Sequence, residues 1–103
     1  MQLQQGDVLI KKADIIPDDA KEIQRKNKAI VLAEGEATGH AHRIFDVEAM
    51  FFEKDGKFYL KNDKSVTVNH EEHKPITIDP GIWEIGRIRE KDWLSGMVRK
   101  VVD

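Results

Sequence analysis

The chain has 103 residues, of which 40% are hydrophobic, and this length predicts one domain, residues 1–103, with a modest core. Seventeen Lys and Arg residues against 19 Asp and Glu residues give a net charge of −2, so the basic surface that nucleic acids or anionic membranes require is not expected. The absence of cysteine excludes disulfides, thiolate zinc fingers, iron–sulfur clusters and thiol nucleophiles. No apolar run approaches the ~18 residues of a membrane span, and residues 1–5 lack the pattern of a secretory signal. We therefore expect a cytoplasmic protein without nucleic-acid or membrane partners.

Short apolar runs separated by turn signals favour strands over long helices. Residues 7–11 are expected to form the first strand. Two interpretations of residues 16–28 remain open. Pro17 followed by two aspartates is typical of the first turn of a helix, whereas residues 26–28, before the apolar run 29–33, suit the turn of a hairpin.

The second half of the chain is richer in strand signals. Further strands are expected at residues 49–54, 57–60, 65–69, 75–78 and 82–89. Asp55-Gly56 predicts a two-residue hairpin loop, and Pro80-Gly81 suits a type II turn. The spacing of Trp93, Met97 and Val101 indicates a short C-terminal helix. We predict an all-β, mainly antiparallel fold, as a small barrel or sandwich.

The four histidines fall as two pairs, His40-Ala41-His42 and His70-Glu71-Glu72-His73. A cluster that takes every histidine in the chain points to a metal, because neutral imidazole is the commonest nitrogen ligand of divalent ions. Alternating phase decides whether the pairs can meet: His40 and His42 share a strand face with Ile44, and His70 shares one with Val66 and Val68. The phase therefore predicts His40, His42 and His70 as metal ligands.

His73 follows His70 by three residues, so a straight strand would turn it to the opposite face. A bend before Pro75 would bring it back. His73 is then either a fourth ligand or, with Glu72, a carrier of protons beside an open coordination position. Asp46, Glu48 and Glu72 are the candidate acidic ligands or hydrogen-bond partners of the histidines.

Gly39-His40-Ala41-His42 followed by Asp46 resembles the first motif of the cupin superfamily, in which His-x-His and a nearby acid bind a metal inside a small β barrel. Pro80-Gly81 is similar to the turn of the second cupin motif. The resemblance implies a further histidine ligand after this turn, but the sequence has no histidine beyond His73, so His70, from the strand before the turn, would have to replace it. Residues 32–42 and 70–76 also resemble segments of a set of small uncharacterised bacterial and phage proteins, and this second resemblance implies no activity.

The function that this pattern favours is a small metalloenzyme that hydrolyses or hydrates a small substrate with a metal-activated water. Zinc is the expected ion, with iron, manganese and nickel as alternatives. Arg43 and Arg89 would bind an anionic substrate if they lie at the mouth of the site. The alternative function is a non-catalytic binding or regulatory module with a structural or sensed metal. The apolar tail around Trp93 predicts a homo-oligomer.

Overall fold

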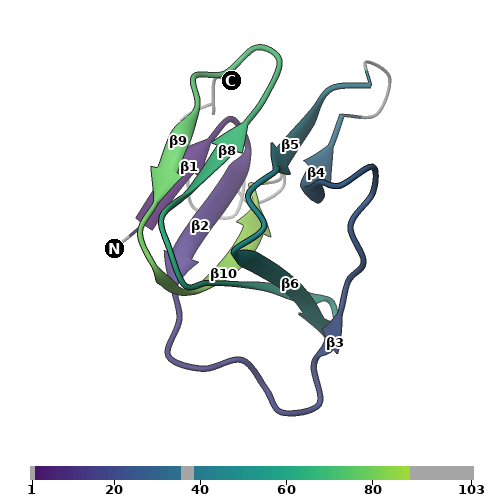
Figure 1. Cartoon of the computed structure of the whole chain (residues 1–103), viewed down its shortest axis with the longest axis vertical. Helices are drawn as coiled ribbons and strands as arrows, with labels where there is room; N and C mark the ends of the chain where they lie inside the picture. Colours follow the sequence, from purple (N-terminus) through teal and green to yellow (C-terminus); the bar gives the residue numbers. More distant parts are fainter. Residues whose placement is uncertain (1, 36–38, 89–103) are drawn as a thin grey trace.

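The computed structural model describes residues 2–35 and 39–88, which form ten strands in two antiparallel sheets (Figure 1). The larger sheet contains, in spatial order, β1 (Gln2–Gln5), β2 (Val8–Lys12), β10 (Gly81–Arg87), β7 (Lys57–Asn62), β6 (Ala49–Lys54) and β3 (Lys21–Glu22). The smaller sheet contains β4 (Ile30–Glu34), β5 (Ala41–Ile44), β8 (Val66–Asn69) and β9 (Ile76–Ile78). The predicted all-β, antiparallel fold is confirmed. The sheets do not close into a barrel, so the sandwich is the arrangement that fits.

The hydrophobic core comes from both sheets. Ile10 and Leu60 of the larger sheet and Ile44 and Val68 of the smaller sheet are all fully buried. Trp83 is 1% exposed, and its indole N–H donates to the Asp79 carbonyl at 3.1 Å. Burial of these alternating side chains provides the main driving force that holds the two sheets together.

Two tight turns lie where the sequence predicted turns. Asp55 and Gly56 have φ angles of 50° and 81°, as a type I′ loop requires, and they join β6 to β7 as predicted. Asn27 and Lys28 have φ angles of 51° and 70° between the mutually hydrogen-bonded residues Lys26 and Ala29. A tight turn therefore forms where the hairpin interpretation expected it, and residues 16–28 contain no helix. The flanking strands β3 and β4 belong to different sheets, so they do not pair as a hairpin.

Other local expectations differ from the structure. Residues 2–5, which carried no strand signal, form β1, because a turn at Gly6 and Asp7 folds them onto β2. Gly81 has a φ of 153°, not the roughly +80° of a type II turn, and it is the first residue of β10. The predicted C-terminal helix lies outside the described residues. Within those residues, no helix is long and apolar enough to cross a membrane.

The two sheets meet in contacts that position the histidines. In Figure 1, β8 and β9 lie over β1 and β2. The side-chain amide of Gln5, at the end of β1, donates to the Val68 carbonyl of β8 at 3.0 Å. The β1–β2 turn is thereby held against the end of β8 from which His70 follows.

Candidate functional site

Strand register places the two histidine pairs at the same end of the smaller sheet. β5 pairs with β8 through Arg43–Asn69 and Ile44–Val68, and one further step of this register sets His42 opposite His70. His40 immediately precedes β5, and His70 immediately follows β8. His42 alternates with Ile44 along one chain segment, and His70 alternates with Val68 along the other. Because Ile44 and Val68 are register partners, this alternation brings the two histidine pairs together.

The rings of the other three histidines all lie close to the ring of His70. Its ring centroid lies 4.4 Å from that of His42, 4.5 Å from that of His73 and 5.7 Å from that of His40. The chain bends at residues 71–73, and this bend carries His73 back toward His70. His42 and His73 also stack, with centroids 5.8 Å apart and planes inclined by 15°.

Burial favours the neutral form of the inner histidines. His42 is only 4% exposed, and its pKa is lowered to about 4, chiefly by burial and then by the neighbouring His70. Burial, followed by the proximity of His73, also lowers the pKa of His70. Neutral imidazole is the form that coordinates a metal, so both rings are in the ligating state near neutral pH.

Three side chains direct potential ligand atoms toward one another. One such atom from each of His40, His70 and Glu71 lies within 4.8 Å of the other two. His40 and His70 belong to the ligand set predicted from the sequence. The third member of the group is Glu71, whereas the sequence predicted His42. Glu72, a predicted proton carrier, has its Oε1 atom 3.5 Å from Nδ1 of His40, so it lies at the edge of the same group.

The carboxylate of Glu71 is fixed by hydrogen bonds. Its Oε1 accepts from the backbone N–H of Ala41 at 3.0 Å, and its Oε2 accepts from Arg43 at 2.7 Å. These bonds, the backbone one first, lower the pKa of Glu71 to about 2. The register that pairs residue 42 with residue 70 also sets Glu71 beside Ala41, and this was the signal that could have identified it.

His42 makes contacts that the sequence did not indicate. Its Nδ1 lies 2.7 Å from Oε1 of Gln5, and its Nε2 lies 3.7 Å from Oδ1 of Asp7. Both partners come from the β1–β2 hairpin of the larger sheet, about 35 residues away along the chain. No spacing or periodicity links residues so far apart, because their contact depends on how the two sheets stack.

Gly6, between Gln5 and Asp7, leaves room for His73. A Cβ atom built on Gly6 would lie 2.7 Å from Nε2 of His73, closer than real contacts allow, and Gly6 has a φ of +58°. The His73 ring therefore lies directly over the β1–β2 turn.

The other acidic candidates lie elsewhere: Asp46 follows the opposite end of β5, where it accepts from the Thr67 N–H, and Glu48 lies further along that connection.

A surface hollow adjoins the histidine cluster. It has a volume of about 240 Å³ and is lined by Ala41, Arg43, Phe45, Asn69, His70 and Glu71. Arg43 lines this hollow and forms an ion pair with Glu71, whereas Arg89, the other residue predicted to bind an anion, lies outside the described residues. The volume is enough for a small molecule in contact with His70 and Glu71.

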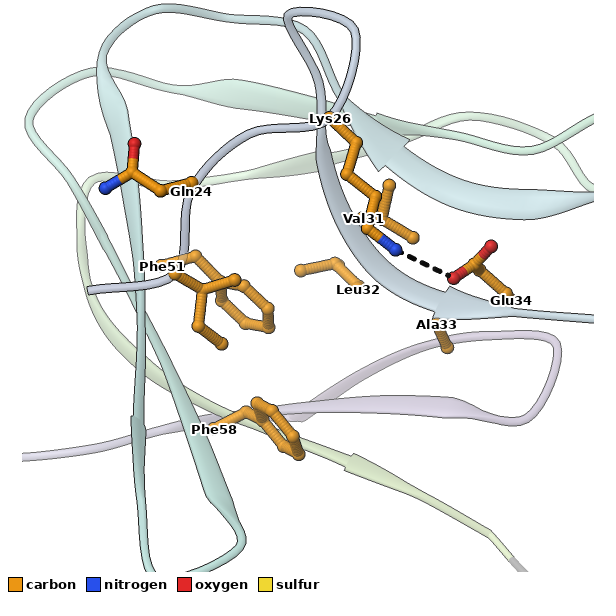
Figure 2. A pocket seen from close by; sticks show the side chains of 9 residues that line it. Gln24, Lys26, Val31, Leu32, Ala33, Glu34, Phe51 and Phe58 are labelled. Atoms are coloured by element: carbon orange, nitrogen blue, oxygen red, sulfur yellow. Dashed lines mark hydrogen bonds and ion pairs between the residues drawn. The ribbon is translucent and has the colours of Figure 1, made fainter. Parts of the chain in front are cut away.

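A separate hollow of about 220 Å³ opens between the sheets (Figure 2). Its apolar lining includes Leu32, Phe51 and Phe58, and the Lys26–Glu34 ion pair, at 3.5 Å, lies at one side. Its walls contain no histidine. The side chains suited to metal chemistry are therefore those at the end of β5 and β8.

The fold and the site define a small antiparallel β sandwich with a histidine-rich cluster where its two sheets meet. The chain belongs to the family described as Domain of unknown function (DUF8820), which matches residues 4–88 and so includes all four histidines. No curated protein and no solved structure matches the chain.

Proposed function

We propose that this domain binds one divalent metal ion through His40, His70 and Glu71 and uses it to activate a water molecule that hydrolyses or hydrates a small substrate. The observation that carries the proposal is the convergence of these three donors within 4.8 Å. Zinc is the ion that best suits two imidazoles and a carboxylate, with iron, manganese and nickel as alternatives.

The surroundings of the three donors support a catalytic role. Three protein ligands leave a coordination position for water, and zinc lowers the pKa of such a water to about 7. The hollow beside His70 and Glu71 offers space for the substrate, and Arg43 there suits an anionic one. His73 and Glu72, next to His70 and His40, are the residues that we assign to proton transfer.

Metal analysis of protein purified without a nickel column tests the site. We expect close to one ion at these donors, and we expect His70→Ala and Glu71→Gln each to lower its occupancy sharply, since each removes a ligand. Glu53→Gln, an exposed change on β6, is the matched control and should retain the metal. Full occupancy in both ligand variants would overturn the assignment.

The role of His42 as a ligand of this ion is a separate prediction. The sequence places His42 in the ligand set, whereas its ring nitrogens lie nearest to Gln5 and Asp7. If the wild type binds a single ion and His42→Ala lowers its occupancy as much as Glu71→Gln does, four donors share that ion.

Exogenous azide or thiocyanate distinguishes a catalytic centre from a closed one. With cobalt in the site, an open position predicts a change in the visible spectrum when the anion binds. His73→Ala should keep the metal and lower turnover. If His73→Ala instead releases the metal as His70→Ala does, and no anion binds, the domain is a non-catalytic module with a structural or sensed metal.

A further inference from the structure

Asp7 and His42 face each other across the junction of the two sheets. Asp7 lies in the β1–β2 turn of the larger sheet, and His42 lies in β5 of the smaller one. Their nearest side-chain atoms, Oδ1 of Asp7 and Nε2 of His42, are 3.7 Å apart. Neither residue belongs to the group of donors formed by His40, His70 and Glu71.

The hydrogen bonds of Gln5 determine which nitrogen of His42 carries the proton. The Gln5 amide nitrogen donates to the carbonyls of Val68, at 3.0 Å, and Lys74, at 2.9 Å, so its oxygen must face His42. An amide oxygen only accepts, and Nδ1 of His42 therefore donates to it over 2.7 Å. In the neutral ring the lone pair is then on Nε2, which is the atom that faces the Asp7 carboxylate.

The carboxylate of Asp7 is held in this orientation by Arg87. Its other oxygen, Oδ2, accepts from Nε of Arg87 at 3.1 Å and from Nη2 at 2.7 Å. Oδ1 is thereby turned toward His42. Two electron-pair donors face each other around a side chain that is 4% exposed, an arrangement that a cation between them stabilises.

The separation of the two atoms fits a shared cation. The observed 3.7 Å is longer than the ~2.7–3.2 Å of a direct N–H···O hydrogen bond. A single bridging water would set two acceptors roughly 4.5 Å apart at ordinary hydrogen-bond lengths. Ligand atoms ~2.0–2.1 Å from one zinc ion lie roughly 3.3–3.6 Å from each other at coordination angles between tetrahedral and trigonal, and the observed 3.7 Å corresponds to a slightly wider angle of roughly 130°.

We propose that a second divalent cation binds between Nε2 of His42 and Oδ1 of Asp7, at the junction of the two sheets. The ring of His73 stacks on that of His42, but among the described residues only His40, His70 and Glu71 bring three potential ligand atoms within 4.8 Å, so water would complete the coordination of this second ion. A donor set of imidazole and carboxylate selects zinc, manganese, iron or cobalt over calcium and magnesium, which prefer oxygen ligands alone. This inference does not depend on the site proposed above.

The position of this ion gives it a structural consequence. It would link the β1–β2 turn of the larger sheet to β5 of the smaller one, alongside the Gln5–His42 hydrogen bond. The ring centroid of His70, a ligand of the first proposed ion, lies 4.4 Å from that of His42, a ligand of the second, so the two sites are neighbours. Neighbouring sites of this kind are common where two metals act on one substrate.

Zinc stoichiometry in the full chain tests the second site. Metal-free protein is saturated with zinc alone, dialysed, and its bound zinc is measured per chain. We expect two ions in the wild type, one in Asp7→Asn and one in Glu71→Gln, because each variant removes a ligand from a different site. Asp14→Asn, an exposed change on the loop after β2, is the matched control and should retain two.

The outcomes separate this inference from the proposed function. One ion that is lost in Asp7→Asn and retained in Glu71→Gln supports the junction site and refutes the other. Two ions in Asp7→Asn, one ion lost in both variants, or no ion in the wild type would overturn the junction site. If Asp7→Asn does not fold, nitrogen NMR of the wild type decides: zinc should shift the Nε2 resonance of His42 while Nδ1 stays protonated, and an unchanged Nε2 resonance overturns the inference.

Discussion

Nδ1 of His42 donates a hydrogen bond to Oε1 of Gln5 over 2.7 Å, and this contact joins the two sheets. Gln5 is 3% exposed and makes two further bonds, to the carbonyls of Val68 and Lys74. One side chain of the larger sheet therefore forms hydrogen bonds with three polar groups of the smaller sheet and of the loop between β8 and β9. The proposed junction site depends on this side chain, because Gln5 orients the His42 ring.

Gln5→Ala should destabilise the metal-free protein markedly. The variant removes the three hydrogen bonds of a buried side chain, at a cost of about 2–3 kcal/mol in the free energy of unfolding and a fall of about 10 °C or more in Tm. Thermal and chemical unfolding would measure both. Gln4→Ala is the control, since Gln4 is exposed and its change should cost no more than about 0.5 kcal/mol. Equal effects of the two changes would contradict the role assigned to Gln5.

Lower pH should destabilise the metal-free protein before its carboxylates titrate. The pKa of His42 is about 4 in the folded chain and about 6.5 when unfolded. Between these values the unfolded state binds more protons, so the free energy of unfolding falls as pH falls, by up to about 3 kcal/mol in total. The lowered pKa of His70 acts in the same direction.

Chemical unfolding at pH 7, 6 and 5, with a chelator present, would measure this slope. His42→Gln should remove the larger part of it. Glu71 contributes at lower pH, because its folded pKa of about 2 lies below its ordinary value and its stabilising effect is lost as pH falls further. A stability that is constant between pH 7 and pH 5 would show that His42 is not held neutral by burial.

Gly6→Ala should be coupled to His73. Its φ of +58° costs an alanine about 1–2 kcal/mol, and the new Cβ would also meet His73. In a His73→Ala background only the backbone cost should remain, so a double-mutant cycle should give a coupling of about 1 kcal/mol. Gly39→Ala is the matched control: its φ is +75°, nothing lies within 4 Å of its Cβ position, and its cost should not change with His73. Additive effects of Gly6→Ala and His73→Ala would contradict the contact.

The sequence was most informative where a local pattern determines geometry. Alternation with Ile44 and Val68 predicted the inward faces of His42 and His70, and these two aliphatic residues are register partners in the structure. Asp55-Gly56 predicted its hairpin because few residue pairs adopt two positive φ angles without strain. The metal, the enzymatic activity and the homo-oligomer remain predictions.

The parts of the site that the sequence did not predict depend on packing between sheets. Gln5 and Asp7 reach His42 only because the β1–β2 turn packs against the end of β8. The polar residues 2–5 have no strand pattern of their own and become a strand by pairing with β2. Glu71 was not among the residues predicted from the sequence, because its position beside Ala41 depends on the pairing of β5 with β8 and on the bend of the chain after His70.

Metal coordination by His70 should release the backbone N–H of Glu72. In the metal-free chain this N–H donates to Nδ1 of His70 over 3.0 Å. If Nδ1 binds the metal, its lone pair is no longer available, and if Nε2 binds, Nδ1 must carry the proton. Either mode removes the acceptor, so zinc should shift the Glu72 amide proton resonance upfield in a two-dimensional NMR spectrum.

The Thr67 amide is the internal control for this prediction. It donates to Oδ1 of Asp46 at 3.3 Å and lies at the far end of β8 from His70, so its resonance should not move. In His70→Ala the response of the Glu72 amide to zinc should disappear, because the acceptor is already absent. If a zinc-saturated wild-type chain keeps the Glu72 resonance of the metal-free state, His70 is not a ligand, and both the sequence-based ligand set and the proposed site lose one of the two residues that they share.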